Sequence, residues 1–344
     1  MKKLFFYTAI AALMMFAFTT STDAQKGNRK GVKDDNGYSE IYNNLEYRLI
    51  GPFRGGRASA VVGIPGDRKT FYQGATGGGV WKTEDAGKSW KNISDGFFGG
   101  TIGAVEVAQS DNNIVFSAGG EKSVRGNVSH GYGIWKSLNG GETWEYKGLE
   151  DGQFIPRLRV HPDNPDLVYA AVLGHLFGPN SERGIYRSND GGDTWENILF
   201  VNENAGGCDL ILDPVNPRII YASTWRIRRT PYSLESGGEG SALWKSTDGG
   251  DTWINLNDKP GFPEGTIGII GVSLSADNPK KIYSIIDKIG GNYLNRVIFK
   301  DGFYVEEGGQ RLCVRNSSTV SGICVTCEGK DAVSEIEKIK GAVT

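Results

Sequence analysis

An eight-residue stretch, Ser188-Asn189-Asp190-Gly191-Gly192-Asp193-Thr194-Trp195, is the clearest regularity in this chain of 344 residues. Variants of it lie at 83–90, 137–144 and 246–253, and we refer to the four stretches as the box turns. Their third residues are spaced by 54, 51 and 58 positions: Asp85, Asn139, Asp190 and Asp248. This spacing predicts a structural unit of about 50 residues that repeats along the chain.

A second phrase recurs between the box turns, a polar turn followed by a short apolar run. One example is 163–169, and similar phrases lie at 111–116, 216–221 and 277–283, with a looser one at 65–72. The chain therefore holds five units. In the third unit we expect strands at 156–160, 167–172, 184–188 and 194–198. Four short strands in a repeat of this length are typical of a β-propeller blade, so the sequence predicts an all-β propeller with about five blades.

The composition is consistent with many tight turns and argues against nucleic acid as a partner. Gly accounts for 50 residues and Pro for 12, while 11% of the residues are aromatic. Frequent Gly is costly in long helices but suits turns, and the aromatic residues supply material for a core. The chain has 38 Lys and Arg against 40 Asp and Glu, a formal net charge of −2. This balance argues against a nucleic-acid partner.

The residue types in the box turns favour a structural role. An Asp or Asn side chain can accept N–H groups of a tight turn, Gly adopts positive φ, and Trp begins the outermost strand against the core. We therefore assign structural roles to the acidic or amide residue and to the Trp of every box turn: Asp85, Trp90, Asn139, Trp144, Asp190, Trp195, Asp248 and Trp253.

The box turns resemble the Asp-box, or BNR repeat, of sialidases, sortilin-type (Vps10) domains, photosystem assembly factors and family 74 xyloglucanases. The chain shows a closer resemblance to exported bacterial BNR proteins with a sortilin-like propeller, in the stretches Tyr47–Arg57, Gly77–Lys82 and Glu235–Gly238. The resemblance covers about residues 45–285 and implies binding of a peptide, protein or glycan. Members of that family are usually longer, so either the propeller is small or the chain is a truncated or fused fragment of a longer protein, and the fragment is favoured.

Catalysis is the alternative function. A glycosidase needs two positioned carboxyl groups, and the resemblance implies one catalytic Asp in the first blade of family 74 enzymes, at a position that holds Gly77 here. The Arg-Ile-Pro phrase of sialidases is missing, since 154–157 has those letters in another order. Carboxylates that could still form a pair include Glu121, Glu182, Asp209 and Glu235. A xyloglucanase-like or sialidase-like hydrolase therefore stays open.

The two ends of the chain differ from the repeats. Lys2 and Lys3 precede an apolar run and a Thr22-Asp23-Ala24 cleavage site, which predicts a signal peptide over 1–24 and export to the periplasm or the extracellular space. Residues 25–42 form a flexible lead-in, 43–305 the propeller, and 306–344 a divergent tail. The tail holds Cys313, Cys324 and Cys327, for which a disulfide is favoured over zinc. No membrane span is expected in the mature chain.

The connections between second and third strands are the best candidates for a binding site. They are long and variable, at 119–133, 173–184 and 224–242, and long loops on a rigid scaffold usually carry binding residues. Trp225 beside several Arg residues suits an acidic or sugar-like ligand, by stacking and by charge. The three histidines give no pattern for a metal, so no cofactor is expected. The predicted ligand-binding residues are Arg54, Arg57, Arg157, Trp225, Arg226, Arg228, Arg229 and Tyr232.

Overall fold

The computed structural model describes residues 57–124, 128–259, 262–275, 281–288, 293–300, 303–304 and 314–315. The predicted signal peptide, the lead-in, Arg54 and the three tail cysteines lie outside these residues. No helix in the described part of the chain is long and apolar enough to cross a membrane.

Five antiparallel sheets make up the described residues, three of four strands and two of five. The first contains β1 (Ala58–Gly63), β2 (Phe71–Ala75), β3 (Gly79–Thr83) and β4 (Lys91–Asn92). The second contains β5 (Ile102–Val107), β6 (Val115–Gly119), β7 (Ile134–Ser137) and β8 (Glu145–Tyr146), and the 3₁₀ turn η1 (Glu150–Gly152) follows it. The third contains β9 (Arg157–Val160), β10 (Val168–Val172), β11 (Gly184–Ser188) and β12 (Glu196–Leu199).

The two later sheets each have an additional strand. The fourth contains β13 (Ala205–Leu212), β14 (Ile220–Arg229), β15 (Leu234–Ser236), β16 (Ala242–Ser246) and β17 (Ile254–Asn255). The fifth contains β18 (Ile267–Leu274), β19 (Lys281–Lys288), β20 (Tyr293–Lys300), β21 (Phe303–Tyr304) and β22 (Val314–Arg315). Because β22 pairs with β20, two residues of the predicted tail belong to the fifth sheet.

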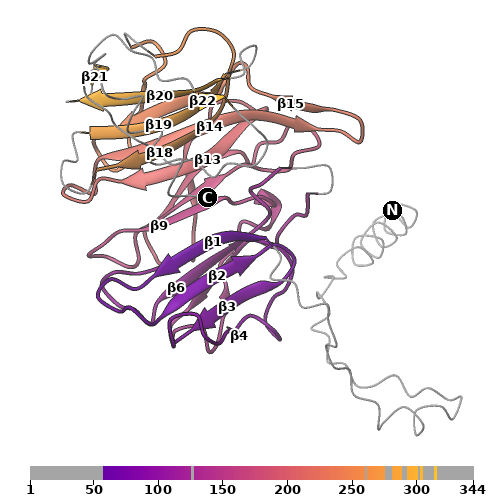
Figure 1. Cartoon of the computed structure of the whole chain (residues 1–344), viewed down its shortest axis with the longest axis vertical. Helices are drawn as coiled ribbons and strands as arrows, with labels where there is room; N and C mark the ends of the chain where they lie inside the picture. Colours follow the sequence, from indigo (N-terminus) through magenta and orange to yellow (C-terminus); the bar gives the residue numbers. More distant parts are fainter. Residues whose placement is uncertain are drawn as a thin grey trace, which may run out of the picture. The chain divides into compact units, whose positions relative to one another are not determined.

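The first strands of successive sheets lie next to one another, in the order β1, β5, β9, β13 and β18. Each sheet then extends outward through hairpins (Figure 1). This is the arrangement of propeller blades, so the prediction of an all-β propeller is confirmed. The hydrophobic core lies between blades. Tyr72 of the first blade shares a cluster with Trp144 of the second, and Tyr221 of the fourth shares one with Ile270 of the fifth.

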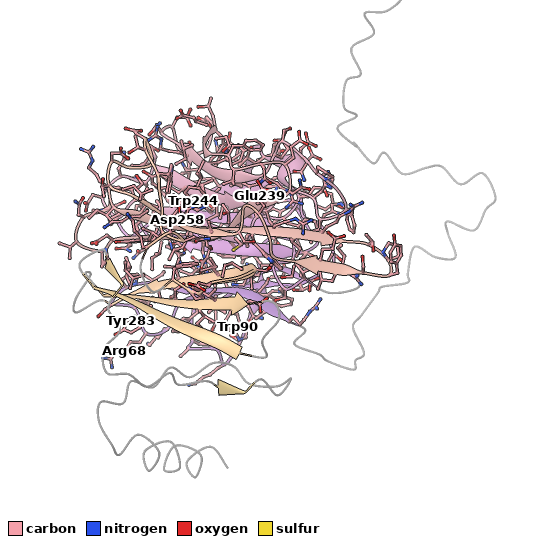
Figure 2. The ribbon with its side chains drawn as sticks, turned by 90° about the horizontal axis from the view of Figure 1, so that it is seen from above. Arg68, Trp90, Glu239, Trp244, Asp258 and Tyr283 are labelled. Carbon is pink, nitrogen blue, oxygen red and sulfur yellow. The ribbon has the colours of Figure 1, made fainter. Side chains whose placement is uncertain are left out.

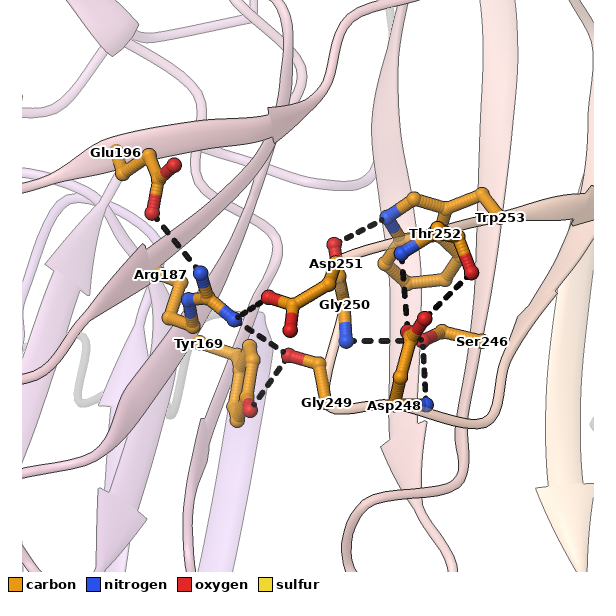
Figure 3. Close-up of polar contacts among 10 residues, drawn as sticks. All are labelled: Tyr169, Arg187, Glu196, Ser246, Asp248, Gly249, Gly250, Asp251, Thr252 and Trp253. Atoms are coloured by element: carbon orange, nitrogen blue, oxygen red, sulfur yellow. Dashed lines mark hydrogen bonds and ion pairs between the residues drawn. The ribbon is translucent and has the colours of Figure 1, made fainter.

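The box turns are closed by one repeated set of hydrogen bonds, shown for the fourth blade in Figure 3. The Ser246 hydroxyl accepts the Gly250 N–H at 2.8 Å and donates to Asp248 Oδ1 at 2.7 Å. The Asp248 carboxylate also accepts the backbone N–H and the hydroxyl of Thr252. Equivalent bonds occur around Asp85, Asn139 and Asp190. The structural role predicted for these residues is therefore visible in the structure.

These hydrogen bonds stabilise the charged form of the box carboxylates. The Ser89 hydroxyl and N–H lower the pKa of Asp85 to about 2. The Thr194 side chain lowers the pKa of Asp190, and the Thr252 side chain lowers that of Asp248. Asn139 occupies the same position in the second blade and accepts the same N–H group without a charge.

The box turns also join each blade to the one before it. Trp144 Nε1 donates to the Ile93 carbonyl of the first blade at 2.8 Å, and Trp195 Nε1 donates to the Lys147 carbonyl of the second at 2.7 Å. Trp144 is 7% exposed, whereas Trp90, in the first blade, is 38% exposed. Trp90 is more exposed because no earlier blade packs on it within the described residues.

Side chains of the preceding blade hold the next box turn from its other side. The Tyr169 hydroxyl and Arg187 Nη1 both donate to the Gly249 carbonyl, each at 3.0 Å (Figure 3). Arg187 Nη1 also lies 2.7 Å from Asp251 Oδ1. The Tyr72 hydroxyl makes the corresponding bond to the Gly140 carbonyl at 3.2 Å. The box turn is thus both the end of a hairpin and the contact between neighbouring blades.

Candidate functional site

The connections between second and third strands mark one edge of the propeller. In an up-and-down blade these connections, the end of the fourth strand and the start of the next blade all lie at the same edge, which we call the loop-rich edge. The box turns lie at the opposite edge. Connections β6–β7, β10–β11 and β15–β16 therefore share the loop-rich edge, where binding residues are expected.

Charged side chains of the innermost strands pair with one another across blades. Arg157 Nε lies 2.7 Å from Asp209 Oδ1, which joins the third blade to the fourth. Arg159 Nη1 lies 3.0 Å from Glu106 Oε2, which joins the third blade to the second. Burial raises the pKa of Glu106, an effect that Arg159 opposes. We call Glu106, Arg157, Arg159 and Asp209 the axial network.

A further ion pair lies at the start of β1. Arg57 Nη2 is 2.7 Å from Glu121 Oε1, and the Glu121 side chain is fully buried. Asp209 also accepts the Val272 N–H at 3.0 Å. Two of the predicted binding residues, Arg57 and Arg157, thus contact carboxylates of the protein itself. The same contacts engage Glu121 and Asp209, which the sequence left open as possible catalytic groups.

The segment 224–242 is not the long loop that the sequence predicted. Strand β14 continues to Arg229 and pairs with β15, with Ile227 opposite Ser236. The resulting hairpin is visible at the right of Figure 1. The apolar and β-branched residues of 220–227 continue the strand because they face a second strand and the core. The prediction of a loop here is wrong.

Trp225 is a core residue rather than a ligand-facing one. It is 6% exposed, packs in a cluster with Phe154, Leu173 and Ile227, and donates through Nε1 to Ser236 Oγ at 3.0 Å. The expectation that it lies in an exposed loop is therefore wrong. It instead anchors β15 to β14 and to the third blade.

The remaining predicted residues of the hairpin differ in their surroundings. Arg226 pairs with Glu235 at 3.2 Å, and Arg229 donates to the Thr230 carbonyl at 2.7 Å. Arg228 is exposed, and Tyr232 is 89% exposed at the hairpin turn. The structure thus brings these residues to one hairpin, while their role in binding stays a prediction.

A buried arginine orders the connection between β10 and β11. Arg183 is 1% exposed and donates to the carbonyl oxygens of Asn204 at 2.9 Å, His175 at 2.9 Å and Ile227 at 3.2 Å. Burial lowers its pKa to about 10. These bonds tie the connection between β10 and β11 to β14 and to the start of the fourth blade.

A cavity of about 440 Å³ opens at the loop-rich edge of the fourth blade. Its walls come from the residues before β16, the residues after β17 and the entry to β18. Trp244 contributes an aromatic side chain, and Glu239 and Asp258, both exposed, contribute carboxylates (Figure 2). The lining residues are Val201, Gly238, Glu239, Gly240, Ser241, Ala242, Trp244, Asn255, Asn257, Asp258, Gly265, Thr266 and Ile267.

Several polar groups of the cavity wall are fixed by the fold. Trp244 Nε1 donates to Thr224 Oγ1 at 2.9 Å. Asn257 accepts the Leu243 N–H at 3.0 Å and donates to the Ser241 carbonyl at 2.9 Å. The indole and this amide are therefore held in place before any ligand arrives. An aromatic face beside carboxylates and amides can stack on a sugar ring and accept hydrogen bonds from its hydroxyl groups.

The sequence alone did not predict this cavity. Trp244, Glu239 and Asp258 are not among the ligand-binding residues that the sequence predicted. A signal was nevertheless available, because Glu239 precedes a third strand and Asp258 follows a fourth strand. Propeller topology places both positions at the same edge.

The position of the expected catalytic Asp also lies at this edge. Gly77 falls in the turn between β2 and β3, with φ of 77°. This left-handed conformation favours glycine, so the residue serves the turn.

Comparisons with known proteins agree with the fold. No family model matches the chain. A xyloglucanase from Paenibacillus sp is 27% identical over 186 residues, which cover 50% of this chain and 16% of that protein. A xyloglucanase from Hypocrea jecorina is 24% identical over 261 residues, which cover 67% of this chain and 29% of that protein. The chain thus spans less than a third of the length of these relatives.

The chain also superposes on solved structures of GH74 enzymes. An ancestral GH74 enzyme superposes with a TM-score of 0.56 and 18% identity, over 77% of this chain and 32% of that one. The GH74 enzyme of Niastella koreensis superposes with a TM-score of 0.53 and 19% identity, over 72% of this chain and 38% of that one. The chain therefore contains a β-propeller related to those of the GH74 glycoside hydrolases.

Proposed function

We propose that this propeller binds a polysaccharide chain in the cavity at the loop-rich edge of its fourth blade. The observation that carries the proposal is the combination of Trp244 with the exposed carboxylates of Glu239 and Asp258 around one cavity. The volume of about 440 Å³ falls in the range of small-molecule sites. Relatives of the propeller are named xyloglucanases, so xyloglucan oligosaccharides are the first ligands to test.

Binding without turnover is the preferred form of this proposal. Three of the four carboxylates that the sequence offered for catalysis form ion pairs: Glu121 with Arg57, Asp209 with Arg157, and Glu235 with Arg226. The fourth, Glu182, accepts a hydrogen bond from the Ser181 hydroxyl at 3.4 Å. Gly77 stands where the resemblance places a catalytic Asp. Glu239 and Asp258 are the carboxylates of the cavity, and we assign them hydrogen-bonding roles toward sugar hydroxyl groups.

The experiment is calorimetric titration of the protein with xyloglucan oligosaccharides, followed by analysis of released reducing ends. The double variant Glu239→Gln with Asp258→Asn should weaken binding about 10-fold or more, because each hydrogen bond to a charged acceptor contributes about 1.5–3 kcal/mol. Glu142→Gln, an exposed carboxylate in a box turn, is the control and should bind as the wild type does. Equal affinity of all three proteins would refute the site. Release of reducing ends by the wild type, lost in the double variant, would replace binding with hydrolysis.

We further propose that the protein acts after export, as the signal peptide over 1–24 predicts. Cleavage after Ala24 should leave Gln25 as the first residue of the protein recovered from its native host. Intact-mass analysis tests this, and a species that retains Met1 would contradict export by this route.

A further inference from the structure

The first blade exposes a position that the other four described blades bury. In every blade the first strand places an apolar residue opposite the residue that follows the Tyr or Phe of the second strand. In the first blade this residue is Val61, which lies opposite Gln73 and is 66% exposed. Its counterparts are Val105 (5% exposed), Leu158 (0%), Leu210 (0%) and Val272 (9%). Val61 and Val105 are the same type of residue, so the difference comes from what packs on them.

In the second to fifth blades, the preceding blade covers this position. Val105 belongs to a hydrophobic cluster with Tyr72 of the first blade, and Val272 belongs to one with Tyr221 of the fourth. The third and fourth blades show the same arrangement. No blade precedes the first within the described residues, and Val61 is left in contact with water.

The Trp of the first box turn lies on the same side of its blade. Trp144 and Trp195 each donate through Nε1 to a carbonyl of the preceding blade. Trp90 occupies the same position, is 38% exposed and makes no such bond within the described residues. We call the side of the first blade that bears Val61 and Trp90 the leading face. It is the side on which the later blades contact their predecessors.

The fifth blade exposes the opposite side. In the earlier blades the second residue after the Tyr or Phe of the second strand faces the next blade. Ala118 packs in a cluster with residues of the third blade, and Ser223 donates to the Ile270 carbonyl of the fifth at 2.7 Å. Both are 0% exposed, whereas Ile285, at this position in the fifth blade, is 51% exposed. We call the side of the fifth blade that bears Ile285 and Tyr283 the trailing face.

Tyr283 matches the trailing face to a box turn. It occupies the strand position of Tyr72 and Tyr169, whose hydroxyl groups donate to a carbonyl in the box turn of the next blade. The corresponding carbonyl in the first box turn belongs to Ala86. The trailing face thus has the residue type that contacts a box turn, and the leading face belongs to a blade whose box turn no described blade contacts.

We propose that copies of this chain associate head to tail, with the leading face of one copy packed on the trailing face of the next. The contact repeats the one that joins neighbouring blades within each chain, so the complementary surfaces are present on a single sequence. Both faces are exposed in one chain and therefore do not cover each other there. Removal of Val61, Trp90 and Ile285 from water supplies the driving force. Because the contact uses a different surface of each copy, it repeats into a ring or an open row of copies.

Sedimentation velocity over a range of protein concentrations measures this association. The wild type should form species of two or more chains. Val61→Asp and Ile285→Asp should each weaken self-association about 10-fold or more, because the contact would bury an unpaired carboxylate. Val215→Asp and Ile254→Asp are the matched controls, since both residues are exposed, at 74% and 50%, and lie outside the two faces. Thermal unfolding of each variant shows whether it is folded.

A mixture of the two single variants tests the head-to-tail geometry. Val61→Asp keeps an intact trailing face, and Ile285→Asp keeps an intact leading face. An equimolar mixture should therefore form a complex with one copy of each variant, although neither variant associates with itself. The complex should not grow further, because its two remaining faces carry the substitutions.

A wild type that stays monomeric at every concentration would overturn the proposal. Self-association that Val61→Asp or Ile285→Asp leaves unchanged would overturn it as well, and so would a mixture in which the two variants do not combine. The contact uses no residue of the cavity in the fourth blade. Binding of xyloglucan oligosaccharides should be the same in Val61→Asp as in the wild type, so failure here is distinguishable from failure of the cavity.

Discussion

In three of the four box turns an Asp carboxylate accepts hydrogen bonds that help to close the turn, and its charge state makes the fold sensitive to acid. The carboxylates of Asp85, Asp190 and Asp248 accept bonds that lower their pKa values below the ordinary value of 3.8. A lowered pKa contributes stability above the unfolded value, and that contribution disappears as the pH falls through the folded value. For Asp85 the window runs from about pH 4 down to about pH 2.

The expected result is a fall in the free energy of unfolding across that window. Asp190→Asn should flatten the fall and should be well tolerated at pH 7, because Asn139 makes the corresponding backbone bond in the second blade. Asp190→Ala should be less stable than Asp190→Asn at pH 7, since it removes the acceptor altogether. Urea unfolding at several pH values checks this. An Asn variant as acid-sensitive as the wild type would show that the box carboxylate is not the titrating group.

Trp225 gives a second prediction at the scale of a residue. Because it is buried against Phe154, Leu173 and Ile227, Trp225→Ala should lower the free energy of unfolding by about 3–5 kcal/mol. Tyr232→Ala, in the same hairpin but 89% exposed, should change it by less than about 0.5 kcal/mol. Chemical denaturation measures both, and similar values for the two variants would contradict the burial of Trp225.

The sequence predicted the strands better than it predicted the surroundings of individual side chains. The expected strand 184–188 matches β11 (Gly184–Ser188), because box turns and polar turns bracket every unit. Trp225 was misread because three nearby Arg residues suggested an exposed segment. Its burial depends on β15, whose pairing with β14 begins several residues further along the chain. The residues next to Trp225 in the sequence do not reveal this pairing.

At the scale of an element, the hydroxyl groups of the second strands couple neighbouring blades. Tyr72 donates to the Gly140 carbonyl and Tyr169 to the Gly249 carbonyl, each across a blade boundary. Tyr72→Phe and Tyr169→Phe should each lower the free energy of unfolding by about 1 kcal/mol. Tyr221 lies at the equivalent strand position, and within the described residues its hydroxyl has no hydrogen-bond partner. Tyr221→Phe is therefore the matched control and should be near neutral.

Urea titration of these three variants separates coupling from packing, since each substitution removes one oxygen and leaves the ring. A loss for Tyr221→Phe equal to that of the other two would mean that the hydroxyl bonds to the box turns do not carry the effect.

At the scale of the whole molecule, residues that lie far apart in the sequence come together in the axial network and in the cavity of the fourth blade. Arg157 and Asp209 are 52 positions apart, close to one repeat. The sequence could place both on first strands, but it could not show that they pair and so cease to be available for a ligand. The cavity has the same origin, because Glu239, Trp244 and Asp258 come from three separate connections or strands of one blade. Propeller topology predicts that they share an edge, while their convergence on one cavity depends on packing.

Hydrogen exchange in the presence of ligand tests the central claim most directly, because it locates binding on the chain. With the protein saturated by a xyloglucan oligosaccharide, amide exchange should slow at 238–242, 255–258 and 265–267, the three segments around the cavity. Exchange in the box turn at 188–195 should stay unchanged. Unchanged exchange in all three cavity segments at saturation, or slowing confined to the hairpin at 226–234, would contradict the account.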